Sequence, residues 1–167
     1  VVNRFLLPNR REPQFRRNLQ ELYRLQANYW AVIRRSLRRP VDPAVFSELL
    51  SRFHMVYHEA AQYTGQLPPE QAAYHQARLV VMWNMFAELE QAEGMIQNGA
   101  VCPEEIPAME ALARELETHV DPLRGLEEIH PEVLPRDELY YVISRYLDNA
   151  RTLHSGDATR AEISVEE

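Results

Sequence analysis

The stretch "ARLVVMWNMFAEL", residues 77–89, is apolar over most of the circumference of a helix. A helix without a polar side is normally contacted by neighbours in several directions. The surrounding segment begins at Pro68 and Pro69, where proline fits the first turn, and continues to about Gln97. We therefore expect a long, central helix around which the other helices pack.

Four further helices are predicted from apolar residues that recur at three- and four-residue steps and from proline at the boundaries. Their expected ranges are about 13–39, 43–61, 107–120 and 135–154. No strand-like alternation and no internal repeat is present. The sequence thus predicts an all-α fold, an elongated helical bundle of about five helices with a central third helix.

The predicted bundle covers residues 13–154, and each end of the chain has a different composition. Residues 1–12 form an apolar and basic lead-in that we expect to lie close to a membrane. Residues 155–167 contain little that could be buried, which predicts a flexible tail. The chain also begins with Val1, so we expect it to be a piece of a longer protein.

Charge is distributed unevenly along the chain. Residues 1–40 contain ten arginines and two acids, a balance of +8, whereas residues 41–167 contain eight arginines and twenty-three acids, a balance of −15. All eighteen basic residues are arginine. A basic end on an acidic body indicates an anionic surface close to that end.

Several classes of protein are disfavoured by composition. Cys102 is the only cysteine, so no intramolecular disulfide can form and a reducing compartment is expected. The longest apolar run, "LVVMW" at 79–83, is far shorter than the ~20 residues that a membrane-spanning helix needs. The start of the chain does not have the order of a signal peptide, in which basic residues precede an apolar stretch.

Histidines provide one possible metal site. His54 and His58 are four residues apart on one predicted helix, and His75 is a possible third ligand. The first two lie at the edge of an apolar stripe, where histidines commonly pack without binding a metal. A zinc hydrolase would carry glutamate directly after the first histidine, and Met55 stands there. We therefore expect neither a metal nor a cofactor.

Two arginine-to-histidine spacings, Arg114 to His119 and Arg124 to His130, resemble the motif of HEPN-type helical ribonucleases. The surrounding acidic residues would repel an RNA backbone. A basic helix face with aromatic residues could also bind nucleic acid, but those aromatics belong to the apolar stripe on the opposite face. The expectation is that the protein is not an enzyme and that nucleic acid is not its partner.

Three stretches carry a resemblance to a known family: "VVNRFLLP" at the start, "RRNLQELYRLQANYW" at 16–30 and "ISRYLDNARTL" at 143–153. Together they resemble the cytoplasmic helical region of fusaric-acid-resistance-like membrane proteins, which include aromatic-acid exporters. The resemblance implies a non-enzymatic accessory domain of an efflux-type transporter at the cytoplasmic face of the bacterial inner membrane. The implied partner is the anionic membrane surface or the membrane domain of the same parent protein.

The residues predicted to make this contact are all arginines of the first forty positions. They are Arg4, Arg10, Arg11, Arg16, Arg17, Arg24, Arg34, Arg35, Arg38 and Arg39. Pairing of these arginines with acidic helices of the same or another subunit is the alternative. A soluble helical scaffold, a partner-binding subunit and a homo-oligomer also stay open, as does a docking role for part of the third helix.

Overall fold

The computed structural model describes the backbone of residues 2–118 and 137–166 and the side chains of residues 12–118 and 138–153. These residues form five α-helices and no strand, which confirms the predicted all-α bundle. The helices are α1 (Val2–Ser36), α2 (Pro43–Thr64), α3 (Pro69–Gln97), α4 (Ile106–Thr118) and α5 (Asp137–Glu166), and a single 3-10 turn, η1 (Pro103–Glu105), precedes α4.

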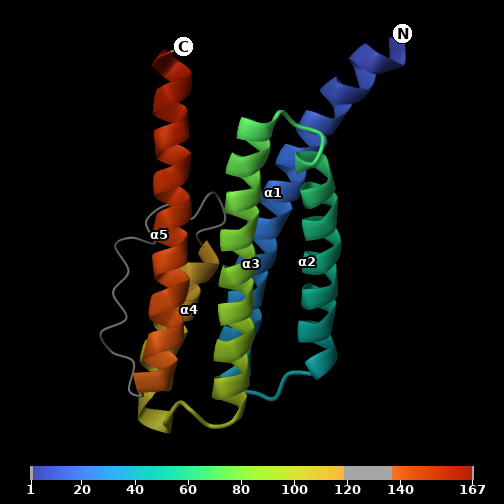
Figure 1. Ribbon diagram of the computed structural model, residues 1–167. Helices are drawn as coiled ribbons and strands as arrows, with labels where there is room; N and C mark the ends of the chain where they lie inside the picture. Colours follow the sequence, from blue (N-terminus) through green and yellow to red (C-terminus); the bar gives the residue numbers. More distant parts are fainter. Residues whose placement is uncertain (1, 119–136, 167) are drawn as a thin grey trace.

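Helices α1 and α3 form the middle of the bundle (Figure 1). Helix α3 contacts α1, α2 and α5, which confirms that it is contacted on several sides. Helix α1 contacts α2, α3 and α4. The start of α1 and the end of α5 lie at the same end of the molecule, close to the turn between α2 and α3 (Figure 1).

Aromatic side chains join the three helices at the centre of the core. The rings of Phe53 on α2 and Phe86 on α3 are stacked with centroids 3.9 Å apart, and Tyr29 of α1 meets Phe86 edge-on at 5.1 Å. All three side chains are buried. Aromatic pairs of this kind contribute about 0.5–1.5 kcal/mol beyond the burial of their area.

The boundaries of α2 and α3 follow from local chemistry. The carboxylate of Asp42 accepts a hydrogen bond from the backbone N–H of Ala44 at 3.0 Å, and Pro43 occupies the first turn of α2. After α3, Gly99 adopts a φ of +81°, a left-handed conformation that glycine tolerates best and that ends the helix. Both boundaries agree with the sequence prediction.

Two predicted boundaries are wrong. Helix α1 starts at Val2 and includes Pro13, where the sequence predicted its start. A proline removes one backbone hydrogen bond, but good helix formers around it can continue the helix. Helix α5 continues to Glu166, although helical structure was expected to end near Leu153, because extending a formed helix requires no further burial.

Candidate functional site on the first helix

Two of the three stretches on which the resemblance rests, residues 16–30 and 143–153, meet inside the bundle. The hydroxyl of Tyr146 on α5 donates a hydrogen bond to Oε1 of Gln26 on α1 at 3.0 Å. The ring of Trp30, one turn further along α1, meets the Tyr146 ring edge-on at 5.4 Å. All three side chains are buried, and burial raises the pKa of the Tyr146 hydroxyl. These side chains therefore link α5 to α1, although α5 packs mainly on α3.

The basic end of α1, residues 2–17, begins past the α2–α3 turn, outside the bundle, and enters the bundle at Phe15 (Figure 1). Phe15 is the anchor there, because its ring stacks on Tyr63 of α2 at 4.6 Å and meets His75 of α3 edge-on at 4.9 Å. Arg4, Arg10 and Arg11 lie in the turns before this anchor. This end of the helix contains five arginines and one acid, Glu12.

Arg16 and Arg17 belong to the basic end of α1, and their hydrogen bonds stay within their own helix. Arg16 pairs with Glu12 at 2.7 Å, and Nη2 of Arg17 donates to Oε1 of Gln14 at 2.9 Å. The Arg16 side chain is 73% exposed and that of Glu12 57%, so water screens this pair strongly. These two contacts therefore do not connect α1 to another helix.

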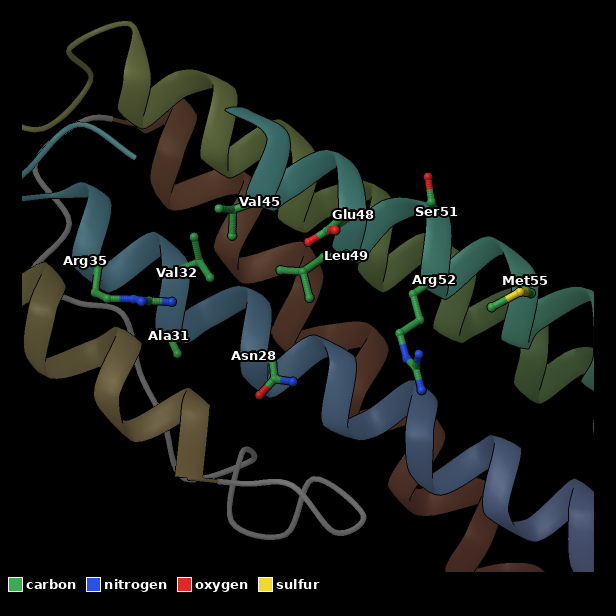
Figure 2. Close-up of a pocket in the computed structure, with 10 residues that line it drawn as sticks. All are labelled: Asn28, Ala31, Val32, Arg35, Val45, Glu48, Leu49, Ser51, Arg52 and Met55. Atoms are coloured by element: carbon green, nitrogen blue, oxygen red, sulfur yellow. The ribbon is translucent and has the colours of Figure 1, made fainter. Parts of the chain in front are cut away.

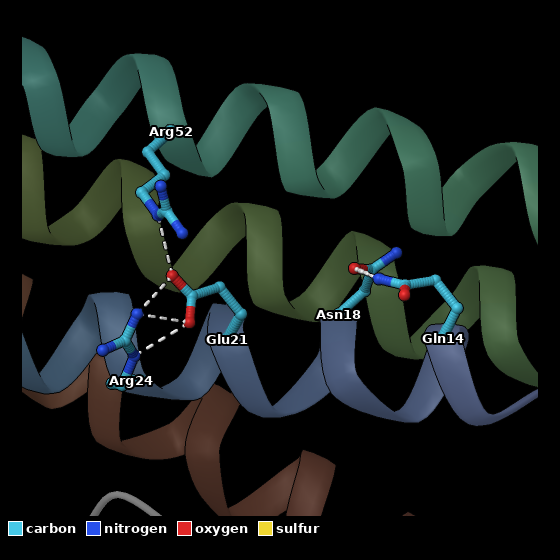
Figure 3. Close-up of polar contacts among 5 residues, drawn as sticks. All are labelled: Gln14, Asn18, Glu21, Arg24 and Arg52. Atoms are coloured by element: carbon cyan, nitrogen blue, oxygen red, sulfur yellow. Dashed lines mark hydrogen bonds and ion pairs between the residues drawn. The ribbon is translucent and has the colours of Figure 1, made fainter.

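Arg24 donates two hydrogen bonds to the Glu21 carboxylate, and Arg52 of α2 donates a third to the same carboxylate (Figure 3). Nε of Arg24 and Nε of Arg52, on α2, each donate to the Glu21 carboxylate at 2.8 Å. The hydrogen bond from Arg24, with a smaller effect of Arg52, lowers the pKa of Glu21 although burial opposes it. One turn further towards the N-terminus, the Gln14 amide donates to Asn18 at 3.0 Å (Figure 3).

Arg34 and Arg38 hold α4 against α1. Arg34 donates from Nε and Nη2 to the two oxygens of Glu117 at 2.8 and 3.0 Å, and Arg38 pairs with Glu110. The hydrogen bond from Arg38 lowers the pKa of Glu110. Arg24, Arg34 and Arg38 are therefore each paired with an acid of the same chain, and their contact with a membrane or partner stays a prediction.

Arg35 lies in a groove between α1 and α2 of about 570 Å³ (Figure 2). Glu48 and Arg52 of α2 line the same groove, together with apolar side chains such as Val45 and Leu49. The groove therefore contains charged side chains of both signs. Arg39, the last of the predicted contact residues, is exposed beyond the end of α1.

The histidines take part in aromatic packing. His54 stacks on Trp83 with centroids 5.0 Å apart and an angle of 12°, His58 is exposed on α2, and His75 contacts Phe15. Over the described ranges, no group of three His, Cys, Asp or Glu side chains is placed to hold a metal ion. Arg114 is exposed on α4, whereas His119, Arg124 and His130 lie outside the described residues.

The comparisons with known proteins do not extend this description. No protein-family model matches the chain, and neither does any curated protein or solved structure. Within the described ranges, no helix combines the length and the apolar character that a bilayer crossing requires.

Sequence reasoning did not predict which arginines are engaged within the chain. Glu110 and Glu117 are seven residues apart, so they lie on the same face of α4, two turns from each other. Their partners Arg34 and Arg38 are four residues apart, about one helical turn. This acidic face of α4 was visible in the sequence, but only the fold shows that α4 lies along α1. The exposure of Val80 and Trp83 on α3 was also not predicted.

Proposed function

We propose that the protein is a non-enzymatic helical accessory domain that contacts an anionic membrane surface through the basic end of α1. The observation that carries this proposal is the division of the arginines along α1. Those near α4 pair with acids of that other helix, whereas Arg16 and Arg17 are exposed and make their described hydrogen bonds within α1, near the end that extends past the bundle. Clustered arginines attract anionic headgroups by roughly 1 kcal/mol each.

The family resemblance extends this proposal to the cytoplasmic face of a bacterial inner membrane and to an efflux-type transporter. The placement of both helix ends is compatible with this role, because α1 begins and α5 ends at the same end of the bundle (Figure 1). A domain inserted between two membrane regions would need this arrangement. The hydrogen bond between Gln26 and Tyr146 supports this, because it joins the stretches 16–30 and 143–153, on which the resemblance rests, into one structural unit.

Vesicle binding tests the proposal with a matched pair of variants. Arg16→Glu with Arg17→Glu changes the charge at the basic end, and Arg35→Glu with Arg39→Glu makes the same change at the other end of α1. We expect the protein to sediment with phosphatidylglycerol vesicles, less strongly as salt increases, and not with phosphatidylcholine vesicles. The first variant should lose this binding and the second should retain it.

Three results would contradict the proposal. They are equal binding to both kinds of vesicle, equal loss of binding in both variants, and preference for RNA over phosphatidylglycerol vesicles when both are present. The last result would assign the basic end to nucleic acid instead.

A further inference from the structure

One face of α3 is exposed and carries no charge over four turns. Its exposed residues between positions 73 and 87 are Ala73, Gln76, Ala77, Val80, Trp83, Asn84 and Ala87, here called the uncharged face. Val80 is 53% exposed and Trp83 38%. In a chain with 26% charged residues, an exposed helix face without charge is unusual, and such surfaces mark contacts with other macromolecules.

The spacing of the uncharged face suits a helix as its partner. Ala73, Val80 and Ala87 are seven residues apart, and Gln76 and Trp83 fall between them in the pattern of a helix–helix seam. The other sides of α3 are already covered by α1, α2 and α5. The uncharged face is therefore the side of this all-round apolar helix that lacks a neighbour within the described residues.

Trp83 is fixed in place before any partner arrives. Its ring stacks on the His54 ring with centroids 5.0 Å apart. The centroids of the Tyr57 and Phe53 rings, also on α2, lie 4.8 and 6.0 Å from that of Trp83. A rigid, half-exposed tryptophan loses little conformational entropy on binding, which is typical of residues that anchor an interface.

The residues of the uncharged face are arranged symmetrically about Val80. Ala77 and Trp83 are each three residues away, Gln76 and Asn84 four, and Ala73 and Ala87 seven. If a second α3 lies antiparallel across Val80, each tryptophan meets an alanine, each glutamine an asparagine, and the alanines at the ends meet each other. Large residues thus face small ones and polar residues face polar ones, which is the self-complementarity that a two-fold contact requires.

We propose that the uncharged face of α3 binds a second copy of this chain, with the two α3 helices antiparallel and Val80 on the two-fold axis. Electrostatics favours this face, because a protein of net charge −7 repels its own copy and can approach it most closely where charges are absent. The contact does not depend on the basic end of α1.

The size of the uncharged face sets the expected strength of the dimer. Fifteen residues span roughly 22 Å, and one pair of helices of this length buries less than the ~800 Å² per partner of a standard interface. His54 and Tyr57 beside Trp83 extend the surface. Glu70 and Glu90, each ten residues from Val80, would meet across the ends and limit the affinity. We expect a reversible dimer that dissociates on dilution.

Sedimentation velocity over a range of protein concentrations tests the contact. Val80→Glu places two carboxylates on the two-fold axis and should weaken dimerisation by roughly tenfold or more. Met55→Glu is the matched control, since Met55 is 56% exposed but lies beside the α1–α2 groove. Circular dichroism verifies that both variants are folded. A monomer at every concentration, or a Val80→Glu variant that dimerises like the parent, would overturn the proposal.

Cysteine cross-linking tests the antiparallel arrangement. In a Cys102→Ser background, Gln76→Cys and Asn84→Cys are oxidised separately and as a mixture. The antiparallel contact brings position 76 of one copy to position 84 of the other, so the mixture should form disulfide-linked dimers and each variant alone should not. Efficient cross-linking of either variant alone would overturn the arrangement.

Discussion

The contact between Tyr146 and Gln26 shows how much one buried polar pair can determine in a small bundle. Both side chains are almost fully buried, and Tyr146 supplies the hydrogen bond to Oε1 of Gln26 at 3.0 Å. A buried polar group that loses its partner costs more free energy than the intact hydrogen bond contributes. The pair therefore penalises any displacement of α5 along α1, because displacement leaves both groups unsatisfied.

Replacing Tyr146 with phenylalanine should lower the free energy of unfolding by about 1–3 kcal/mol, because Oε1 of Gln26 is left buried without a donor. Urea unfolding measures this change. Tyr141→Phe is the control. Tyr141 is 65% exposed, so removal of its hydroxyl group should change the free energy of unfolding by less than about 0.5 kcal/mol.

A double variant separates the hydrogen bond from packing. Gln26→Met combined with Tyr146→Phe replaces both partners by apolar groups of similar size and should recover most of the stability lost in Tyr146→Phe. Strictly additive losses in the two single variants would contradict a direct coupling between these side chains.

At the scale of helices, a non-local feature is the attachment of α4 to α1 by Arg34 and Arg38. The Arg34–Glu117 pair is two-pronged and partly shielded, with side chains 28% and 19% exposed. Two parallel hydrogen bonds between an arginine and a carboxylate fix orientation as well as distance. They set how α4 lies on a bundle whose other contacts are mainly apolar.

Arg34→Ala should reduce the free energy of unfolding by about 1 kcal/mol and increase amide hydrogen exchange in α4 more than elsewhere. Arg16→Ala provides the comparison, because its exposed pair with Glu12 should contribute less than about 0.5 kcal/mol. Equal effects of the two substitutions would show that Arg34 does not attach α4.

The helices themselves were largely predictable, because their signals are local. Asp42 and Pro43 mark the start of α2, and the apolar stripe of α5 from Leu139 to Leu153 is buried as its spacing indicated. The start of α1 was missed because Pro13 gives the same local signal whether a helix begins there or passes through it. Local signals therefore define most helix interiors better than they define the ends.

The candidate surfaces were harder to predict, because they depend on which helices become neighbours. The sequence gives Arg34 and Arg16 the same basic character, and only the position of α4 separates them. The middle of helix α3 is apolar over most of its circumference, so its sequence does not identify which side stays exposed. Exposure of Val80 and Trp83 is a property of the assembled bundle.

At the scale of the whole molecule, the buried tyrosines couple stability to alkaline pH. Burial raises the pKa of Tyr29 and of Tyr146. Above pH ~10 the unfolded chain loses these two protons while the folded chain keeps them, so stability should fall as pH rises beyond that value. Urea unfolding midpoints at several pH values between about 8 and 11, the range over which tyrosine titrates, measure how steeply stability falls with pH.

The Tyr146→Phe variant checks the source of this alkaline slope. It should lose stability less steeply than the parent above pH ~10, because one of the two buried tyrosines with a raised pKa is gone. An identical slope in both proteins would assign the alkaline sensitivity to other groups.

The direction of the basic end of α1 has a consequence for a dimer that forms through α3. An antiparallel two-fold axis sends the two basic ends to opposite poles, so a dimer is bivalent and cannot lay both ends on one flat bilayer. Such a dimer would bridge two vesicles and make a suspension of phosphatidylglycerol vesicles turbid, while Val80→Glu would bind without clustering them. Copies anchored side by side in one membrane would keep their α3 faces apart, and tethering of two opposed membranes would bring them together.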